Sequence, residues 1–146
     1  MKRLLLAFAP FALATLAVVG VRAAGGVGGF IDETERVTRT VKIESSGTVQ
    51  LKSFSGRVAI SATDSTDVVV DAVRRAPRER LDHIKLDVQS NGSTVYIDAN
   101  RRDSTWWSWR NNVVETDFDI KVPRRVKLDV SVFSAPVTVQ IGRAHV

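Results

Sequence analysis

The strongest candidate for a binding site is a cluster of tryptophan and arginine residues in the second half of the chain. All three tryptophans of this 146-residue protein fall within four positions, and arginines flank them on both sides. Tryptophan and arginine are enriched at binding hot spots, and loops on a rigid scaffold often carry such sites. The candidate ligand-binding residues are Trp106, Trp107, Trp109, Arg101, Arg102 and Arg110.

Three kinds of partner fit this cluster. A cell-envelope glycan would stack on the indole faces, an anionic lipid would pair with the arginines, and a protein partner would use both. The alternative is structural, with the indoles folded back over a sheet edge or an open end of the core. The polar neighbours Asp103, Asn111 and Asn112 favour exposure of the cluster.

The chain offers little else for catalysis or metal binding. It has no cysteine, which excludes disulfides, thiolate metal sites and thiol nucleophiles. Glu115, Asp117 and Asp119 would share one face of a strand. Three such carboxylates could recruit calcium, but we interpret them as a solvated face that protects a strand edge. With His83 as the one usable histidine, we predict no catalytic residue, no metal site and no cofactor.

The net charge does not indicate a nucleic-acid partner. The formal charge of +5 comes from 21 Lys and Arg against 16 Asp and Glu. Lys2, Arg3 and Arg22 precede every acidic residue, and without these three the balance is 18 against 16, a charge of +2. Because the excess of positive charge belongs to the N-terminus, we predict no nucleic-acid binding.

The first 23 residues are typical of a secretory signal peptide. Lys2 and Arg3 precede an uncharged stretch of 18 residues that ends at Val21, and Val21-Arg22-Ala23 offers a cleavage site. The alternative is an uncleaved membrane anchor, because about 20 apolar residues span a bilayer. Both interpretations predict export to the periplasm or the cell surface, with residues 24–36 as a flexible linker.

The C-terminus interrupts the pattern of the sequence. Residues 141–146 match the in-frame translation of a short-read sequencing adapter and break off an alternating run. We therefore expect these six residues to be an artefact, and the domain formed by residues 37–140 to be truncated by an unknown number of repeats.

Between these ends, apolar and polar residues alternate over short runs bounded by turn residues, which predicts about nine strands with one buried face. Asn91-Gly92 is a favoured pair for a two-residue hairpin turn with two positive φ angles. Pro77 followed by residues 78–84 predicts the one short helix. We predict an all-β fold, an antiparallel or solenoid-like stack of short strands (a β-solenoid or β-roll), with an N-terminal signal helix.

An internal repeat supports the stack. Residues 54–60 align with residues 133–139 in the pattern Phe-Ser-small-x-Val-x-aliphatic, and Leu51 aligns with Val130. A strand that ends in an inward Phe, turns and starts again is the unit from which solenoids are stacked. We expect one shared interior to bury Phe54, Phe133, Val58, Ile60, Val137 and Val139.

At these residues the chain resembles the bacterial putative-adhesin domain of unknown function built from β-strand repeats. The likeness spans residues 37–140 and includes the Val122-Pro123 dipeptide that leads into Leu128-Asp129-Val130. It implies strand solenoids or rolls at the cell envelope. The chain departs from the family pattern at Ala135-Pro136, where glycine is usual.

The resemblance implies an exported, non-enzymatic β-repeat scaffold, an adhesin-like binding module of the bacterial cell envelope. One alternative is an envelope-stress sensor or regulatory module anchored by its N-terminal segment. A third interpretation, a carbohydrate-active enzyme on a β-solenoid, requires two carboxylates about 5 to 10 Å apart in a groove.

Overall fold

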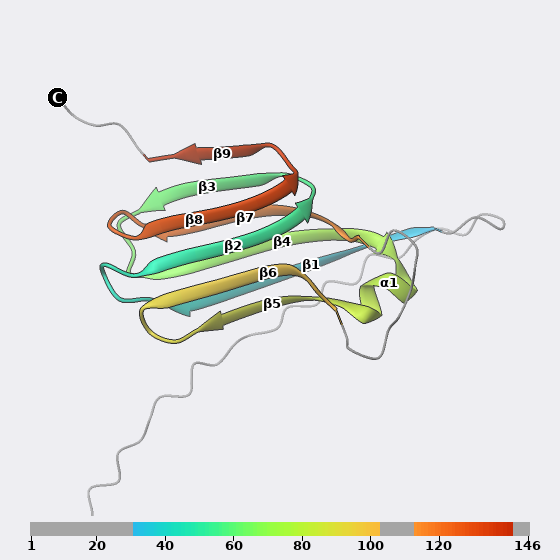
Figure 1. Ribbon diagram of the computed structural model, residues 1–146, viewed down its shortest axis with the longest axis horizontal. Coiled ribbons are helices and arrows are strands. Elements are labelled where there is room, and N and C mark those ends of the chain that lie inside the picture. The colour runs from blue at the N-terminus through green and yellow to red at the C-terminus, as the bar shows by residue number, and fades with distance from the viewer. Residues whose placement is uncertain (1–30, 103–112, 142–146) are drawn as a thin grey trace, which may run out of the picture.

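The computed structural model describes residues 31–102 and 113–141. The predicted signal segment, residues 24–30 of the linker and the tryptophan cluster lie outside the described residues. The described part consists mostly of strands, which confirms the prediction of a β fold (Figure 1). Its elements are β1 (Asp32–Lys42), β2 (Thr48–Ser55), β3 (Val58–Thr63), β4 (Asp67–Pro77), α1 (Arg78–His83), β5 (Ile84–Ser90), β6 (Thr94–Arg102), β7 (Glu115–Pro123), β8 (Lys127–Ser134) and β9 (Val137–Gln140).

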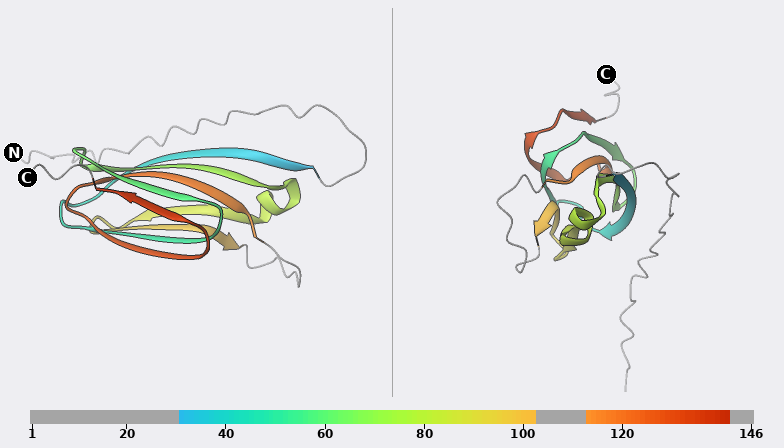
Figure 2. Two further views of the ribbon diagram at one scale, coloured as in Figure 1. Left: turned by 90° about the horizontal axis from the view of Figure 1, so that it is seen from above. Right: turned by 90° about the vertical axis from the view of Figure 1, so that its right-hand side faces the viewer.

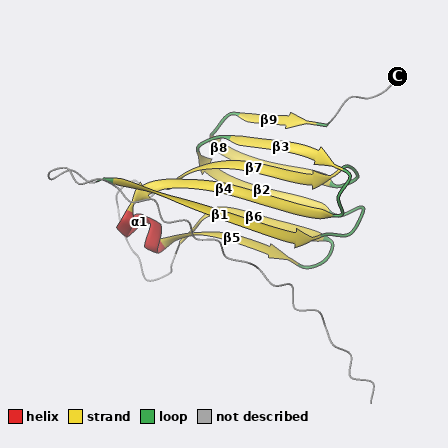
Figure 3. Ribbon diagram, turned by 180° about the vertical axis from the view of Figure 1, so that it is seen from behind, coloured by secondary structure: helices red, strands yellow, loops and turns green. Residues whose placement is uncertain are grey.

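The strands form two open sheets with both parallel and antiparallel pairs. The five-stranded sheet has the order β1-β4-β7-β3-β9 and the four-stranded sheet the order β5-β6-β2-β8. Viewed end-on, the strands of both sheets surround a common centre (Figure 2). The single helix of the described residues, α1, lies at one end of this arrangement (Figure 3).

The core between the sheets is built from the inward faces of β1 to β8. Inward residues alternate with outward ones along β2, β4 and β7, as the period of two requires. Each fully buried Val, Leu or Ile contributes about 1.5 to 3 kcal/mol relative to exposure. The main buried cluster includes Val49, Leu51, Val58, Ile60, Val68, Val70, Val95, Ile97, Phe118, Ile120 and Val122.

The two copies of the internal repeat lie side by side. β8 pairs with β2 in parallel and brings Leu51 opposite Val130, while β9 pairs with β3 and brings Val58 opposite Val137. These are the pairs that the sequence alignment matches. The repeat therefore predicts one neighbour of β2 and one neighbour of β3 correctly.

The expectation that Phe54 and Phe133 are buried is wrong. Phe54 is 40% exposed and Phe133 is 78% exposed, and their rings stack on each other with centroids 4.7 Å apart. The reason is the pleat of the strand. Leu51 and Ser53 point inward, so Phe54, three positions after Leu51, must point outward.

The other residues expected in the interior are buried in the first copy of the repeat and exposed in the second. Val58 and Ile60 on β3 are buried, as expected. Val137 and Val139 on β9 are about two-fifths exposed, which corrects the prediction for these two. β9 is an edge strand, so its inward residues have a neighbouring strand on one side only.

The hairpin at Asn91-Gly92 forms, but its turn differs from the predicted one. β5 and β6 are antiparallel, with Ser90 opposite Val95. Gly92 has a φ of 93°, whereas no other residue type in the described chain has a positive φ. The Asn91 amide donates to the Thr94 carbonyl oxygen at 3.1 Å, so the two central residues are Gly92 and Ser93, one position later than predicted, and only the first has a positive φ.

Candidate binding face

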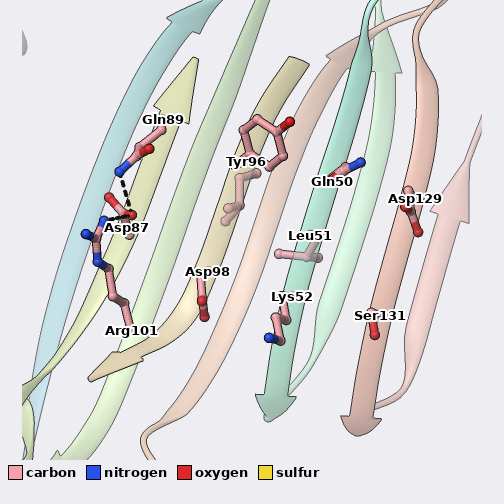
Figure 4. Close-up of a pocket in the computed structure, with 11 residues that line it drawn as sticks. Gln50, Leu51, Lys52, Asp87, Gln89, Tyr96, Asp98, Arg101, Asp129 and Ser131 are labelled. Carbon is pink, nitrogen blue, oxygen red and sulfur yellow. Dashed lines mark hydrogen bonds and ion pairs between the residues drawn. The ribbon is translucent and has the colours of Figure 1, made fainter. Parts of the chain in front are cut away.

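The outer face of the four-stranded sheet carries two rows of side chains that cross all four strands (Figure 4). They occupy outward positions because their neighbours along β2 and β6 fill the core. One row contains Gln89, Tyr96, Gln50 and Asp129, and the other contains Asp87, Asp98, Lys52 and Ser131.

These rows line an open hollow of about 520 Å³. A second hollow, of about 400 Å³, shares Lys52, Asp98 and Ser131 with the first and continues to Phe54 and Phe133. Since they share three residues, we treat them as one feature and call it the outer groove. Asn100 and Arg102 complete its second half.

Aromatic rings stand at both ends of the outer groove. Tyr96 is 44% exposed in the first hollow, and the stacked Phe54 and Phe133 line the second. Tyr96 lies opposite Gln50, four residues before Phe54 on the neighbouring strand. At about 3.3 Å per residue and 4.8 Å per strand, Tyr96 and Phe133 are roughly 16 Å apart along the diagonal of the sheet.

The polar groups between the rings are largely uncommitted. Within the described part of the chain, the side chains of Gln50, Lys52 and Ser131 make no hydrogen bond or ion pair. Asp87, by contrast, is engaged by Arg101 and by Gln89, whose amide nitrogen donates at 2.9 Å (Figure 4). The groove thus offers free amide, hydroxyl and ammonium groups on strands that hold them in place.

The outer groove is nearly neutral. Three cationic side chains, on Lys52, Arg101 and Arg102, face three carboxylates, on Asp87, Asp98 and Asp129. Such a balance gives no strong attraction for a polyanion or an anionic surface. It suits a ligand recognised by hydrogen bonds and ring stacking.

Two of the predicted binding residues belong to this groove. Arg101 lines its first hollow and Arg102 its second, both at the end of β6. Trp106, Trp107, Trp109 and Arg110 follow directly in the chain and lie outside the described residues. Sequence reasoning missed Tyr96 and the polar rows, although the alternation in β6 marks Tyr96 as an outward residue.

Two of the three acidic residues weighed as calcium ligands, Glu115 and Asp117, are paired with arginines instead. Arg75 donates to Asp117 at 2.9 Å and to Glu115 at 3.3 Å, and the backbone amide of Arg57 donates to Asp117 at 3.0 Å. Among residues 31–102 and 113–141, no three histidine or carboxylate side chains converge to hold a metal ion. His83 ends α1 and lines neither hollow of the outer groove.

These ion pairs shift the pKa values of two carboxyls on the five-stranded sheet. The hydrogen bond from Arg36 lowers the pKa of Asp71. Burial raises the pKa of Asp117, but the hydrogen bonds from Arg75 and from the Arg57 amide outweigh it, so the net change is a lowering. Both carboxylates therefore favour the folded state while they are ionised.

Acid is expected to weaken the protein through these two groups. Their stabilisation is complete above the unfolded-state pKa of about 3.9 and is lost as the pH falls through their lower folded-state values. Thermal unfolding between about pH 5 and pH 2 is expected to show a flatter loss of Tm in Asp71→Asn/Asp117→Asn than in the parent. Asp119→Asn, at a residue without an ion pair in the described chain, is the control. An unchanged slope in the double variant would contradict this account.

Comparison with known proteins gives little information about the function of the outer groove. No family model matches the chain, and no curated protein matches it. It is similar to a crystal structure of a putative adhesin from Bacteroides fragilis, with 13% sequence identity and a TM-score of 0.36. The match covers 72% of this chain and 43% of the other, so the chain spans less than half of that protein's length. A TM-score at this level does not establish a shared fold, and the function is therefore argued from the groove.

No helix within the described residues is both long and apolar enough to traverse a bilayer.

Proposed function

We propose that the protein is an exported, non-enzymatic binding module of the bacterial cell envelope, and that it holds its ligand in the outer groove. The observation that carries the proposal is the exposure of aromatic rings at both ends of a groove lined by uncommitted polar groups. Covering an exposed ring such as that of Phe133 with a partner removes apolar surface from water, which makes the free energy of binding more favourable.

The placement of the groove supports binding. Its residues stand on four strands whose opposite faces are packed into the core, and sites on strands are more rigid than sites on loops. The ligand then meets side chains that need little ordering, which reduces the entropic cost of association.

The stacked strand pairs support a solenoid-like scaffold for this module. β8 and β9 run parallel to β2 and β3, and on the other side β6 and β7 do the same. We propose that the three pairs are successive coils of one stack, with the outer groove running across the coils on one side. The signal-like residues 1–23 support export.

The proposal is tested by fractionation followed by binding to washed envelopes. The full-length chain, expressed in a bacterium, is expected to be exported, and the purified protein is expected to sediment with envelopes. Ser131→Arg places a large side chain at the centre of the groove and is expected to weaken sedimentation by about tenfold, equivalent to about 1.4 kcal/mol.

Thr138→Arg is the matched control. Thr138 is exposed on β9 in the other sheet, and the substitution adds the same charge to a similar edge position. Equal retention of the two variants would overturn the role of the groove, and recovery of the uncleaved chain from the cytosol would overturn export.

A further inference from the structure

We infer that the ligand of the outer groove is a neutral oligosaccharide that lies diagonally across the sheet from Tyr96 to Phe133. The inference rests on the proposed function, because it names the ligand class of the same site. It is carried by the two ends of the groove, by the groups between them and by the charge balance.

The ends of the groove offer stacking surfaces of the kind that a sugar ring requires. The apolar face of a pyranose packs on an aromatic ring, as apolar groups generally do. Phe133 is 78% exposed and is backed by Phe54, with an angle of 16° between the two ring planes. The backing ring holds Phe133 in position, so stacking there costs little side-chain entropy.

The middle of the groove offers hydrogen-bonding groups at the spacing of a sheet. Gln50 has both donors and an acceptor, Ser131 has a hydroxyl group, and Lys52 has three donors. These groups lie between the aromatic ends and are uncommitted within the described chain. Sugar hydroxyls are both donors and acceptors, so such a mixed set satisfies them better than a set of one kind.

The charge balance distinguishes a neutral glycan from an anionic lipid. Lys52, Arg101 and Arg102 are offset by Asp87, Asp98 and Asp129, and Arg101 is engaged by Asp87. An anionic headgroup would meet the three carboxylates as well as the cations. The roughly 16 Å diagonal between Tyr96 and Phe133 also suits a chain of linked rings better than a compact headgroup.

The inference is tested by calorimetric titration of the full chain with three neutral hexasaccharides: chitohexaose, cellohexaose and maltohexaose. At least one is expected to bind, with an affinity that changes less than about twofold between 0.05 and 0.5 M salt, since no net charge drives it. Phe133→Ala and Tyr96→Ala are each expected to weaken this binding by about tenfold, and Tyr96→Phe is expected to retain it because the ring remains.

Ile141→Ala controls for the loss of an exposed apolar side chain, because Ile141 is 72% exposed and does not line the groove. Vesicles of phosphatidylglycerol form the competing arm of the test. Salt-sensitive binding to these vesicles without binding to any hexasaccharide would overturn the inference.

The two proposals fail in different ways. The neutral glycan would be overturned if envelopes bind the parent but not Ser131→Arg and no hexasaccharide displaces the parent from them. The proposal of a binding module would then still hold. Envelopes that bind neither protein would overturn the binding module itself.

Discussion

Replacement of Gly56 by alanine is expected to lower the free energy of unfolding by about 2 to 4 kcal/mol. Gly56 makes the corner between β2 and β3 with a φ of 117°, a conformation that residues with a Cβ atom rarely adopt. A Cβ atom at this position would lie 2.0 Å from the carbonyl oxygen of Thr116. Because the obstacle is backbone, the corner itself must move away from β7.

Urea unfolding followed by circular dichroism measures this loss, and Gly92→Ala is the matched control. Gly92 also has a positive φ, but the nearest atom to an added Cβ is a flexible Glu44 carboxylate oxygen at 3.5 Å. Only backbone strain remains there, at about 1 to 2 kcal/mol. If the two variants lost the same stability, the close approach of the corner to Thr116 would not matter.

The corner also explains where the second copy of the repeat differs. Ala135 stands at the position that matches Gly56, and within the described chain no residue other than glycine has a positive φ. The second corner is held to the first by the hydrogen bond from the Val58 amide to the Pro136 carbonyl oxygen, at 3.0 Å. The chain therefore turns there without a left-handed residue, and glycine is not required.

Local patterns in the sequence predict the strands and one set of neighbours. Alternation predicts where β2, β3 and β7 lie, because a half-buried strand must alternate. The alignment of Leu51 with Val130 predicts the pairing of β2 with β8. The prediction for Phe54 fails because the repeat matches residue types, whereas the parity counted from Leu51 puts Ser53 inside and Phe54 outside.

The outer groove could not be predicted in the same way. Its two rows join β5, β6, β2 and β8, and the order of these strands depends on long-range pairing that alternation does not specify. Arg101 and Arg102 are marked in the sequence by their tryptophan neighbours. Gln50 and Ser131 carry no such signal, since each is an ordinary outward residue until the register aligns them.

A second large effect is expected at Arg74, an arginine within the apolar interior. Arg74 is 2% exposed and follows Ala72 on the inward face of β4. One guanidinium nitrogen donates to Glu35 at 2.5 Å and another donates to the backbone carbonyl of Ile84. The side chain thus joins β1 and β4 of one sheet to the start of β5 in the other.

Arg74→Ala is expected to cost about 3 kcal/mol of unfolding free energy, because it opens a cavity and leaves the Ile84 carbonyl without its donor. Glu35, whose side chain is 42% exposed, keeps access to water and adds little to the loss. Arg74→Met fills most of the cavity without restoring the donor, so it is expected to recover part of the stability and to separate the two causes.

Arg78→Ala is the control for the loss of an arginine ion pair at the surface. The side chain of Arg78 is 70% exposed and pairs with Glu33 and Asp82, so its loss is expected to cost less than about 1 kcal/mol. A cost for Arg74→Ala as small as that for Arg78→Ala would mean that the junction between the sheets does not depend on the buried guanidinium. A large cost for Arg74→Ala that Arg74→Met does not reduce would assign the effect to the lost hydrogen bonds rather than to packing.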